Sequence, residues 1–320
     1  MENQVRDYLV LRQGSTPGLG KAPHKPILLL AVIRAFEVGL ITKNEIQITA
    51  ELVSLFRGYW QQLVRTDHSP KFYLPFYHLS NESSALWKHH TVPGFERIMT
   101  SSRSVNSLGA LRAFVLSASL RDDVYMAWQS PVQREADRQQ LLKMYFPDIA
   151  LPPGEPPNYL GDIESQILKD PPAEYIKRIK ALSDQPEEVI EEDEFLRGAA
   201  FKRQIPRIYE YRCAVTGMRI EAGRSTSIVD ACHIVPFATS LDDTISNGIA
   251  LCPNMHRAFD RGLIAISTDY TVLVDAGLVE SDSAYSIRQF ENRAIMLPRE
   301  PKYRPSAANL ANHRIRFGFE

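Results

Sequence analysis

Cysteine is scarce in this chain, which has only three in 320 residues. They are Cys213, Cys232 and Cys252, and no two of them form a Cys-x-x-Cys pair. A small, odd number of cysteines does not predict a disulfide framework, and three cannot supply a four-cysteine zinc site. A mixed cysteine and histidine zinc site stays open as an alternative, although its usual paired spacing is missing.

Long hydrophobic runs are also absent. No apolar stretch approaches the roughly 20 residues that a membrane span needs, and the N-terminal segment MENQVRDYLVLRQGS lacks the pattern of a secretion signal. Hydrophobic and charged contents of 44% and 23% are ordinary for a folded protein, and the length allows two domains. We therefore expect a cytoplasmic protein with no membrane partner.

The chain has almost no net charge, at −1, but the charge is unevenly distributed. Residues 1–150 have 17 Lys and Arg against 13 Asp and Glu, residues 151–196 have 4 against 12, and residues 197–320 have 16 against 13. Two mildly basic blocks thus flank an acidic one. This pattern permits phosphate binding at either basic block without demonstrating it.

The middle of the chain contains the clearest boundary. Five prolines fall within residues 147–157, a density that no helix or central strand tolerates. The acidic run SDQPEEVIEEDE follows at 183–194, and we expect it to be solvated. We predict an α+β protein with a helix-rich α+β domain at 1–150, a connector with one or two short helices at 151–196, and a second domain at 197–320.

Within the first domain, residues 24–40 predict a buried helix, because the run HKPILLLAVIRAFEVGL is apolar on nearly all sides. Residues 50–64 repeat apolar side chains at helical spacing and should pack against it. Residues 71–79 and 85–88 indicate short strands or turns. In the second domain we expect a helix at 194–212, a strand at 225–237, and a short helix that starts near Asn254.

A histidine, an asparagine and a second histidine follow one another through the second domain. His233 lies in the predicted strand, Asn247 in the next loop and His256 in the short helix, with Asp260 one turn later. Phosphodiester hydrolysis needs an activated water and a cation that absorbs charge on the phosphoryl group. A histidine base on a strand and metal ligands on an adjoining helix would supply both.

The surrounding residues resemble the HNH endonucleases, which have a ββα-metal fold. The resemblance rests on YRCAVTG (211–217), DACHIVPF (230–237) and SNGIALCPNMHRAFDRGLI (246–264), and it covers about 197–275. It implies that residues 197–320 are a ββα-metal HNH nuclease domain with one divalent metal ion and no organic cofactor. Mg²⁺ or Mn²⁺ is expected, with Ni²⁺ or Zn²⁺ as alternatives.

The resemblance also implies roles for individual residues. His233 is expected to be the general base, Asn247 the residue that ties down the loop and orients that base, and His256 a metal ligand. Asp230 is the carboxylate expected to complete the metal shell. Asp260 is its rival for that role or a supporting residue.

The sequence departs from the family pattern at three positions. Cys232 stands where many members have Asp or His directly before the base, and Thr216 stands where a structural zinc would have its second cysteine. Cys252 has no following partner, so packing must replace that zinc. Cys232 and Cys252 are expected to be buried as small apolar residues, and the sequence leaves open whether position 232 or Asp230 completes the metal shell. A non-catalytic DNA-binding protein with a degenerate HNH fold therefore stays open as an alternative.

The first domain resembles the sulfur-binding domain of type IV restriction enzymes, which cut DNA that carries phosphorothioate. The resemblance rests on APHKPILLLAVIRAF (22–36) and FYLPFYHLSNESSALWK (72–88). It implies a sulfur- and DNA-binding set of residues, with Arg103 as a phosphate or base contact: His24, Lys25, Leu74, Pro75, His78 and Arg103.

Together these features predict a modification-dependent endonuclease of the type IV restriction class, acting on double-stranded DNA that carries phosphorothioate. A domain that recognises methylated or otherwise modified bases is the alternative. One HNH site cuts one strand, so double-strand cleavage needs two copies or two visits, and a homodimer is expected.

Overall fold

The computed structural model describes residues 6–95, 105–149, 158–182, 184–222 and 226–319. The chain divides into two compact units, here called unit 1 (1–161 with 184–196) and unit 2 (162–183 with 197–320). Helices are combined with short sheets of two or three strands. The predicted α+β class is therefore confirmed. No helix in the described ranges is both long enough and apolar enough to cross a membrane.

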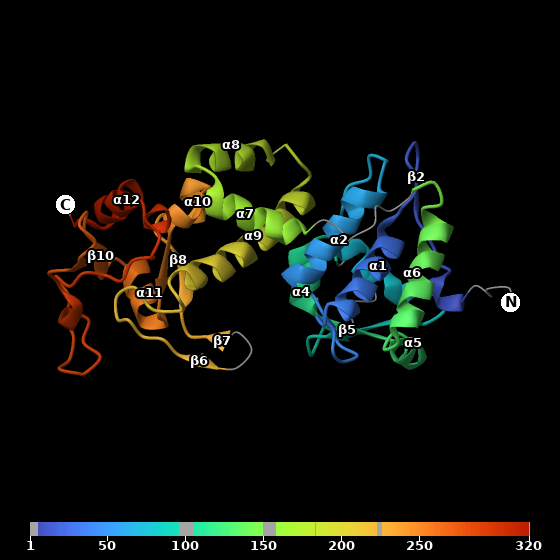
Figure 1. Cartoon of the computed structure of the whole chain (residues 1–320), viewed down its shortest axis with the longest axis horizontal. Helices are drawn as coiled ribbons and strands as arrows, with labels where there is room; N and C mark the ends of the chain where they lie inside the picture. The colour runs from blue at the N-terminus through green and yellow to red at the C-terminus, as the bar shows by residue number, and fades with distance from the viewer. Residues whose placement is uncertain (1–5, 96–104, 150–157, 183, 223–225, 320) are drawn as a thin grey trace. The chain divides into compact units, whose positions relative to one another are not determined.

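Unit 1 combines a helical cluster with a small antiparallel sheet (Figure 1). Its elements are the short strands β1 (Ser15–Thr16) and β2 (Gly20–Lys21), helix α1 (His24–Glu37), β3 (Ile46–Gln47), α2 (Ala50–Leu63), α3 (Tyr73–His78), β4 (Trp87–Thr91), α4 (Leu108–Phe114), β5 (Val115–Leu120), α5 (Asp122–Ala127) and α6 (Pro131–Tyr145).

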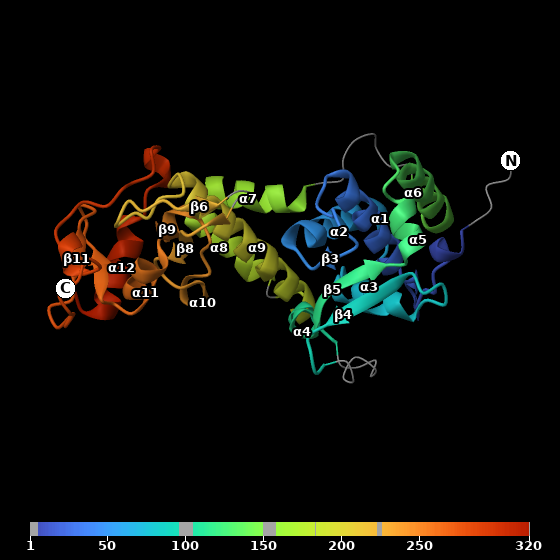
Figure 2. The same ribbon diagram turned by 90° about the horizontal axis from the view of Figure 1, so that it is seen from below.

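Helix α1 is the centre of the core of unit 1. Eleven of its fourteen residues are buried, as its apolar sequence predicted, and it contacts α2, α3 and α6. The sheet has the order β3-β5-β4 with antiparallel pairs. In Figure 2 β4 and β5 lie beside α3. The rings of Phe76 from α3 and Trp87 from β4 are in contact, with 5.1 Å between their centroids.

The expectation of a strand or turn at 71–79 is wrong, because Tyr73–His78 form helix α3. Pro75 is compatible with a helix at this place because it lies in the first turn. The N–H groups of a first turn have no acceptor within the helix, so the N–H that proline lacks is not missed. Residues 85–88 do contribute to a strand, β4.

The acidic run at 183–194 is not fully solvated, and the helix expected from 194 begins earlier, as α9 (Glu187–Ile208). The carboxylate of Glu191 accepts hydrogen bonds from the N–H groups of Leu108 and Gly109, at 2.9 and 2.7 Å. Glu192 is buried and accepts one from the N–H of Phe72, at 2.5 Å. These glutamates satisfy the free N–H groups where α3 and α4 begin, which their place in a charge run did not indicate.

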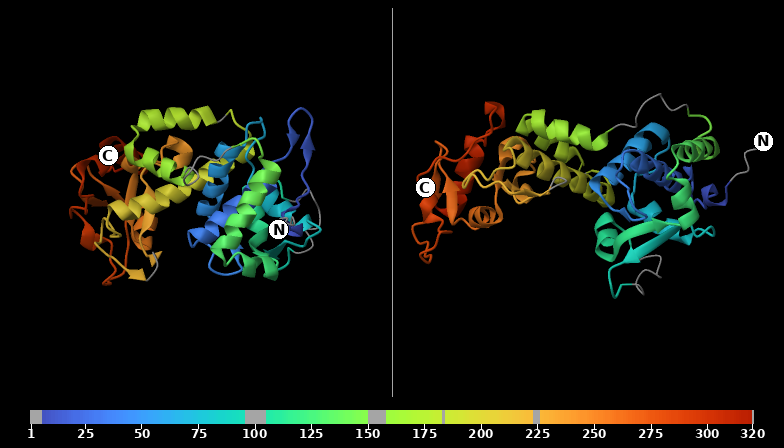
Figure 3. Two further views of the ribbon diagram at one scale, coloured as in Figure 1. Left: turned by 45° about the vertical axis from the view of Figure 1, so that its right-hand side comes forward. Right: turned by 60° about the horizontal axis from the view of Figure 1, so that its bottom comes forward.

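Unit 2 is made of short strands surrounded by helices. Besides the second part of α9, it contains most of α7 (Tyr159–Lys169), then α8 (Pro172–Leu182), β6 (Glu221–Ala222), β7 (Thr226–Ser227), β8 (Asp230–His233), α10 (Phe237–Ser240), β9 (Gly248–Leu251), α11 (Pro253–Asp260), β10 (Ile264–Ile266), β11 (Val272–Val274) and α12 (Ala307–Phe317). Helix α12 contacts β10 of the β10–β11 hairpin, at the red end of the chain in Figure 3.

The two strands and one helix at the centre of unit 2 have the order that the sequence predicted. Strand β8 pairs with β9 in antiparallel register, from Asp230 opposite Leu251 to His233 opposite Gly248. Helix α11 follows at once and contacts both strands. Position 248 must be glycine, because a side chain there would collide with Ile205 of α9.

Candidate functional site

His233 ends strand β8 and is held on two sides. Its ring is stacked parallel to that of Phe201, with 3.8 Å between ring centroids and 3° between planes. Its Nε2 lies 2.8 Å from Oδ1 of Asp243. The side chain is still 26% exposed, so the ring is fixed in place and remains accessible from one side.

Asp243, the partner of His233, is buried and is itself held by two donors. Its Oδ2 accepts from Nη1 of Arg197 at 2.9 Å and from the hydroxyl of Tyr175 at 3.2 Å. Burial, together with the charge of Asp243, raises the pKa of Tyr175, so this hydroxyl stays protonated and donates to the Asp243 carboxylate. Arg197 offsets the charge of Asp243 inside the unit.

The sequence analysis missed this network. Asp243 belongs to an Asp-Asp pair in the loop between the two motifs, and acidic loop residues are usually solvated. Arg197 and Phe201 lie four residues apart on α9, so they occupy the same face of the helix, and that spacing was the available signal.

Asn247 is completely buried and joins both ends of the loop after His233. Its Oδ1 accepts from the N–H of Val235 at 2.9 Å, and its Nδ2 donates to the carbonyl oxygens of Val235 and Asp242, each at 2.8 Å. These bonds tie the residue before Asp243 to the segment after His233. The contacts are those that a loop-fixing residue requires.

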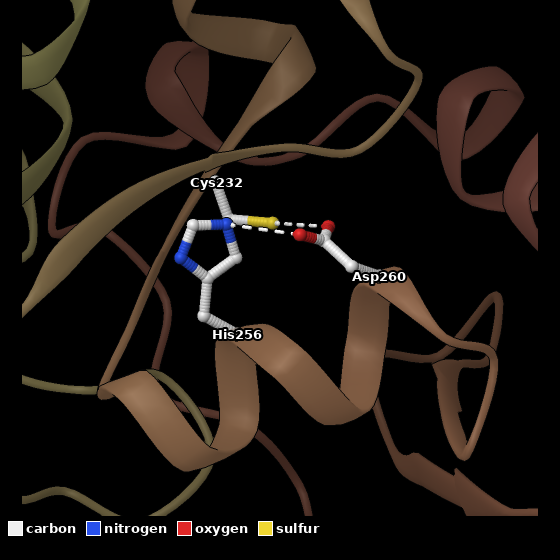
Figure 4. A group of neighbouring side chains, drawn as sticks. All are labelled: Cys232, His256 and Asp260. Carbon is white, nitrogen blue, oxygen red and sulfur yellow. Dashed lines mark hydrogen bonds and ion pairs between the residues drawn. The ribbon is translucent and has the colours of Figure 1, made fainter.

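A second group of side chains gathers on the other face of β8. The ligand atoms of Cys232, His256 and Asp260 all lie within 4.8 Å of one another (Figure 4). Nε2 of His256 is 3.4 Å from Oδ2 of Asp260, and Sγ of Cys232 is 3.6 Å from Oδ1 of the same carboxylate. In the described ranges this is the only such group of three His, Cys, Asp or Glu residues.

Asp230 contacts His256 from the opposite side of the imidazole. Its Oδ2 is 3.3 Å from Nδ1, whereas Asp260 faces Nε2. Both carboxylates are more than half exposed. The two acidic residues that the sequence offered as rivals therefore bracket one ring. Cys232, which the sequence left open as an alternative to Asp230 in the metal shell, takes part in the group that includes Asp260.

An open pocket of about 490 Å³ adjoins this group. It is lined by Asp230, Pro253, Asn254, His256, Arg257, Asp260 and Arg261. Arg257 and Arg261, which the sequence analysis did not single out, add positive charge beside the acidic ligands. A pocket with this lining can accept a phosphate group next to a cation.

The donor set fits a divalent metal ion. Imidazole, carboxylate and thiolate are all metal ligands, and a site with open positions leaves room for water or substrate. Burial raises the pKa of the Cys232 thiol well above its ordinary value, and the Asp260 carboxylate adds to that shift. Without a cation, therefore, the thiol stays protonated.

Cys213 and Cys252 form a separate buried pair. The N–H of Thr216 lies 3.4 Å from Sγ of Cys213, and its hydroxyl lies 3.9 Å from Sγ of Cys252. Hydrogen bonding between the two cysteines lowers the pKa of Cys213 to about 5 and raises that of Cys252. Side-chain packing around these two cysteines thus takes the place of the structural zinc that many family members have.

Unit 1 contains a pocket of its own, of about 450 Å³, with a mainly apolar lining. It is lined by Arg12, Gln13, Gly14, Thr16, Ala22, His24, Lys25, His68, Leu74, Pro75, His78 and Asn81. Five of the six residues predicted for the first domain meet here: His24, Lys25, Leu74, Pro75 and His78. The sixth, Arg103, lies outside the described residues.

The polar groups of this pocket are held in defined states. Burial lowers the pKa of His24 to about 4, so the ring is neutral, and its Nε2 donates to the carbonyl of Ser69 at 2.9 Å. Burial also lowers the pKa of His78. Lys25 forms an ion pair with the buried Glu82. These three side chains therefore add little free charge to the walls of the pocket.

The segment before α1 supplies most of the pocket residues that sequence reasoning missed, and His68 and Asn81 are the others. The β1–β2 hairpin and its flanks contribute Arg12, Gln13, Gly14 and Thr16, and the hairpin stands out from the helices in Figure 3. Arg12 has no ion-pair partner within the part of the chain that the structure describes. Because its guanidinium is free, Arg12 is the residue of this pocket best suited to bind a phosphate.

In comparison with known proteins, part of the chain matches a family model, and the weak structural likenesses include two restriction endonucleases. Residues 213–267 match a family model described as HNH endonuclease. They include His233, Asn247 and His256 and all of β8, β9 and α11. Residues 213–267 are therefore an HNH endonuclease domain, and the predicted class of enzyme is confirmed at that level.

The first structural likeness is to the modification dependent TagI restriction endonuclease, with 24% identity, 37% of each chain covered and a TM-score of 0.28. The second is to the type IV phosphorothioation-dependent restriction endonuclease ScoMcrA, with 12% identity, 79% of this chain and 93% of that chain covered, and a TM-score of 0.31. This chain thus spans little more than a third of the first structure. Both TM-scores are too low to show a shared overall fold. A search of curated proteins found no match.

Proposed function

Because residues 213–267 are an HNH endonuclease domain, we propose that the protein hydrolyses phosphodiester bonds of double-stranded DNA and acts as a modification-dependent restriction endonuclease. In this proposal residues 1–150 are a reader domain that binds phosphorothioate, residues 151–196 are a connector, and residues 197–320 are the nuclease. Cutting both strands requires two nuclease domains or two visits, which favours a homodimer on DNA.

His233 is the proposed general base. A neutral imidazole that donates its Nε2–H to Asp243 keeps a lone pair on Nδ1, and that lone pair can take a proton from water. The water oxygen then bonds to phosphorus while the bond to the leaving oxygen breaks. Asp243 holds the ring in this tautomer and stabilises the imidazolium that forms, and stacking on Phe201 fixes the plane of the ring.

His256 and Asp260 are the proposed metal ligands, with Asp230 either completing the shell or accepting the Nδ1–H of His256. When bound, a divalent ion would stabilise negative charge on the phosphoryl and leaving oxygens. Arg257 and Arg261 line the adjoining pocket and would hold the flanking phosphates. Asn247 keeps the loop between His233 and Asp243 closed.

The pocket of unit 1 suits a phosphorothioate. Sulfur is larger and less strongly hydrated than oxygen, so an apolar wall formed by Leu74 and Pro75 gains by covering it. Covering a phosphate oxygen in the same way would remove its water without returning a hydrogen bond. Arg12 at the pocket and Lys25, whose charge Glu82 offsets, can hold the remaining phosphate charge. We propose that Arg103 contributes as well.

One observation carries the proposal. The accessible His233 pairs with the buried Asp243, and the strand that ends at His233 also contributes Cys232 to the Cys232, His256 and Asp260 group. Its test is cleavage by the full chain, with and without Mg²⁺ or Mn²⁺, of matched duplexes with phosphorothioate, 5-methylcytosine or no modification. Metal-dependent cleavage confined to the phosphorothioate duplex is expected. Because sulfur substitution makes phosphorus a stereocentre, one diastereomer should be preferred.

Other outcomes of this test have distinct meanings. Preference for the methylated duplex would replace the sulfur ligand with a modified base. Equal cleavage of all three duplexes would remove the reader role but leave the nuclease. A Leu74→Asp variant, which puts a carboxylate in the apolar wall, should cleave the phosphorothioate duplex no faster than the unmodified one. No cleavage with either metal would leave a DNA-binding protein with an inactive nuclease fold.

A further inference from the structure

Cys232 lies where its sulfur faces the metal ligands. Successive residues of a strand point to opposite faces, so Cys232 faces α11 while His233 faces Asp243 and Phe201. The side chain is completely buried. Its Sγ lies 3.6 Å from Oδ1 of Asp260 and 3.5 Å from the carbonyl oxygen of His233.

A small apolar residue would fill this space as well as cysteine, so packing alone does not explain a sulfur aimed at a carboxylate. The strand supplies Sγ while α11 supplies Nε2 of His256 and a carboxylate oxygen of Asp260, and all three atoms lie within 4.8 Å of one another (Figure 4). The arrangement brings three different ligand types to one point. Cys213 and Cys252 have no equivalent group among the described residues.

We propose that the thiolate of Cys232 is a direct ligand of the catalytic cation, with His256 and Asp260, and that its sulfur makes the site prefer thiophilic transition ions to Mg²⁺. The proposal rests on the proposed function only in calling the cation catalytic. Thiolate and imidazole are ligands of ions such as Zn²⁺, Co²⁺ and Ni²⁺, whereas Mg²⁺ takes oxygen ligands and keeps most of its water.

The alternative shell consists of His256 with Asp230 and Asp260, and it would suit Mg²⁺ or Mn²⁺. In that shell Asp230 and Asp260 would have to bind the ion together with one ring nitrogen of His256. In the structure the two carboxylates contact different ring nitrogens, Asp230 at Nδ1 and Asp260 at Nε2. An imidazole binds one metal ion through one nitrogen and commonly donates the other N–H to a carboxylate. The contacts therefore favour Cys232 as the third ligand and Asp230 as the acceptor of the second N–H.

The test is titration of the full chain with Co²⁺, followed by absorption spectroscopy. Coordination by Cys232 produces a near-ultraviolet thiolate-to-cobalt charge-transfer band in the parent protein. Cys232→Ser should abolish this band and lower the affinity for Co²⁺ at least about tenfold, with little change in the affinity for Mg²⁺. The matched control Cys213→Ser, which changes a buried thiol outside the group, should keep the band.

A second variant covers the case in which Cys232→Ser does not fold. His256 is partly exposed, so His256→Ala should fold and should require much more Co²⁺ to produce the band. A parent protein without the band, or a band unchanged in His256→Ala, would overturn the proposal. Cleavage without the band would contradict the sulfur ligand and leave the nuclease intact. The band without cleavage would support the ligand and contradict the nuclease.

Discussion

Helix α9 has buried ionisable side chains in both units, and two of them, Glu192 and Arg197, are neutralised in different ways. In unit 2, Arg197 forms an ion pair with Asp243 at 2.9 Å, and both side chains are about 95% buried. In unit 1, Glu192 accepts a hydrogen bond on Oε1, but its Oε2 has no hydrogen-bond partner among the described residues. Burial accordingly raises the pKa of Glu192 to about 7.

The difference shows where a fixed charge is needed. The charge of Asp243 is paired with Arg197 and supported by Tyr175, so it can serve His233 as a permanent acceptor. Glu192 helps to begin α3, the helix that carries Leu74, Pro75 and His78, and a neutral carboxyl accepts that backbone hydrogen bond as well as a charged one. Four substitutions test this contrast.

The largest effect is expected for Asp243→Asn. An amide at this position can present its NH₂ to Nε2 of His233 and so favour the tautomer with a proton on Nδ1, which cannot act as a base. The cleavage rate should fall between about 10³- and 10⁴-fold, or about 4–5.5 kcal/mol, with DNA binding unchanged. The control is Asp242→Asn, which can keep its contact with the N–H of Thr244. Equal losses in both variants would show a disturbed loop, not a lost partner.

Arg197→Ala should have the next largest effect, on stability. Removing one member of a buried ion pair leaves Asp243 charged and unpaired, at a cost of about 3–5 kcal/mol. Arg203 also lies on α9, and its ion pair with Glu164 of α7 is partly exposed. Arg203→Ala removes this pair and should cost less than about 1 kcal/mol. Urea unfolding of both variants measures the contrast, and similar losses would contradict it.

Glu192→Gln should change how stability depends on pH. The carboxyl of Glu192 ionises near 4.5 in the unfolded chain and near 7 in the folded one. Between these values the folded state binds more protons, so the free energy of unfolding should fall as pH rises, by up to about 3 kcal/mol. The variant should lack this fall and should exceed the parent in stability above pH 7. Parallel pH profiles from thermal unfolding would refute the assignment.

The smallest effect is expected for Glu191→Gln. Glu191 accepts the N–H groups of Leu108 and Gly109 on its two oxygens, and glutamine keeps only one acceptor. The loss should be about 0.5–1 kcal/mol, as for other helix caps. Urea unfolding measures the loss, and a loss as large as that expected for Arg197→Ala would contradict this role of Glu191.

The order of strands and helix in unit 2 could be predicted from the sequence because each element has a local signal. Strand β8 shows alternation, Asn247 and Gly248 mark the turn, and Pro253 begins α11. Asp243 and Arg197 could not be predicted as partners, since they are 46 residues apart and their pairing depends on how α9 packs on the loop. The choice between Cys232 and Asp230 for the metal shell could not be made, because sequence does not show where a buried thiol points.

In unit 1 the pocket residues on α1 and α3 could be proposed from a resemblance, although the type of element at 71–79 was wrong. Apolar and aromatic residues at short spacing suit a strand as well as a helix, and here the buried Glu192 supplies an acceptor where the helix starts. Arg12 was missed because the hairpin that follows it has no apolar pattern.

The central claim is that His233 is the base of a metal-dependent nuclease. It is tested most directly by measuring cleavage of a phosphorothioate-containing plasmid by His233→Ala, under titrated Mn²⁺ or Mg²⁺, beside its binding to the same DNA. The account predicts a loss of at least about 10²-fold in the cleavage rate with binding retained. Cleavage at the parent rate would contradict it.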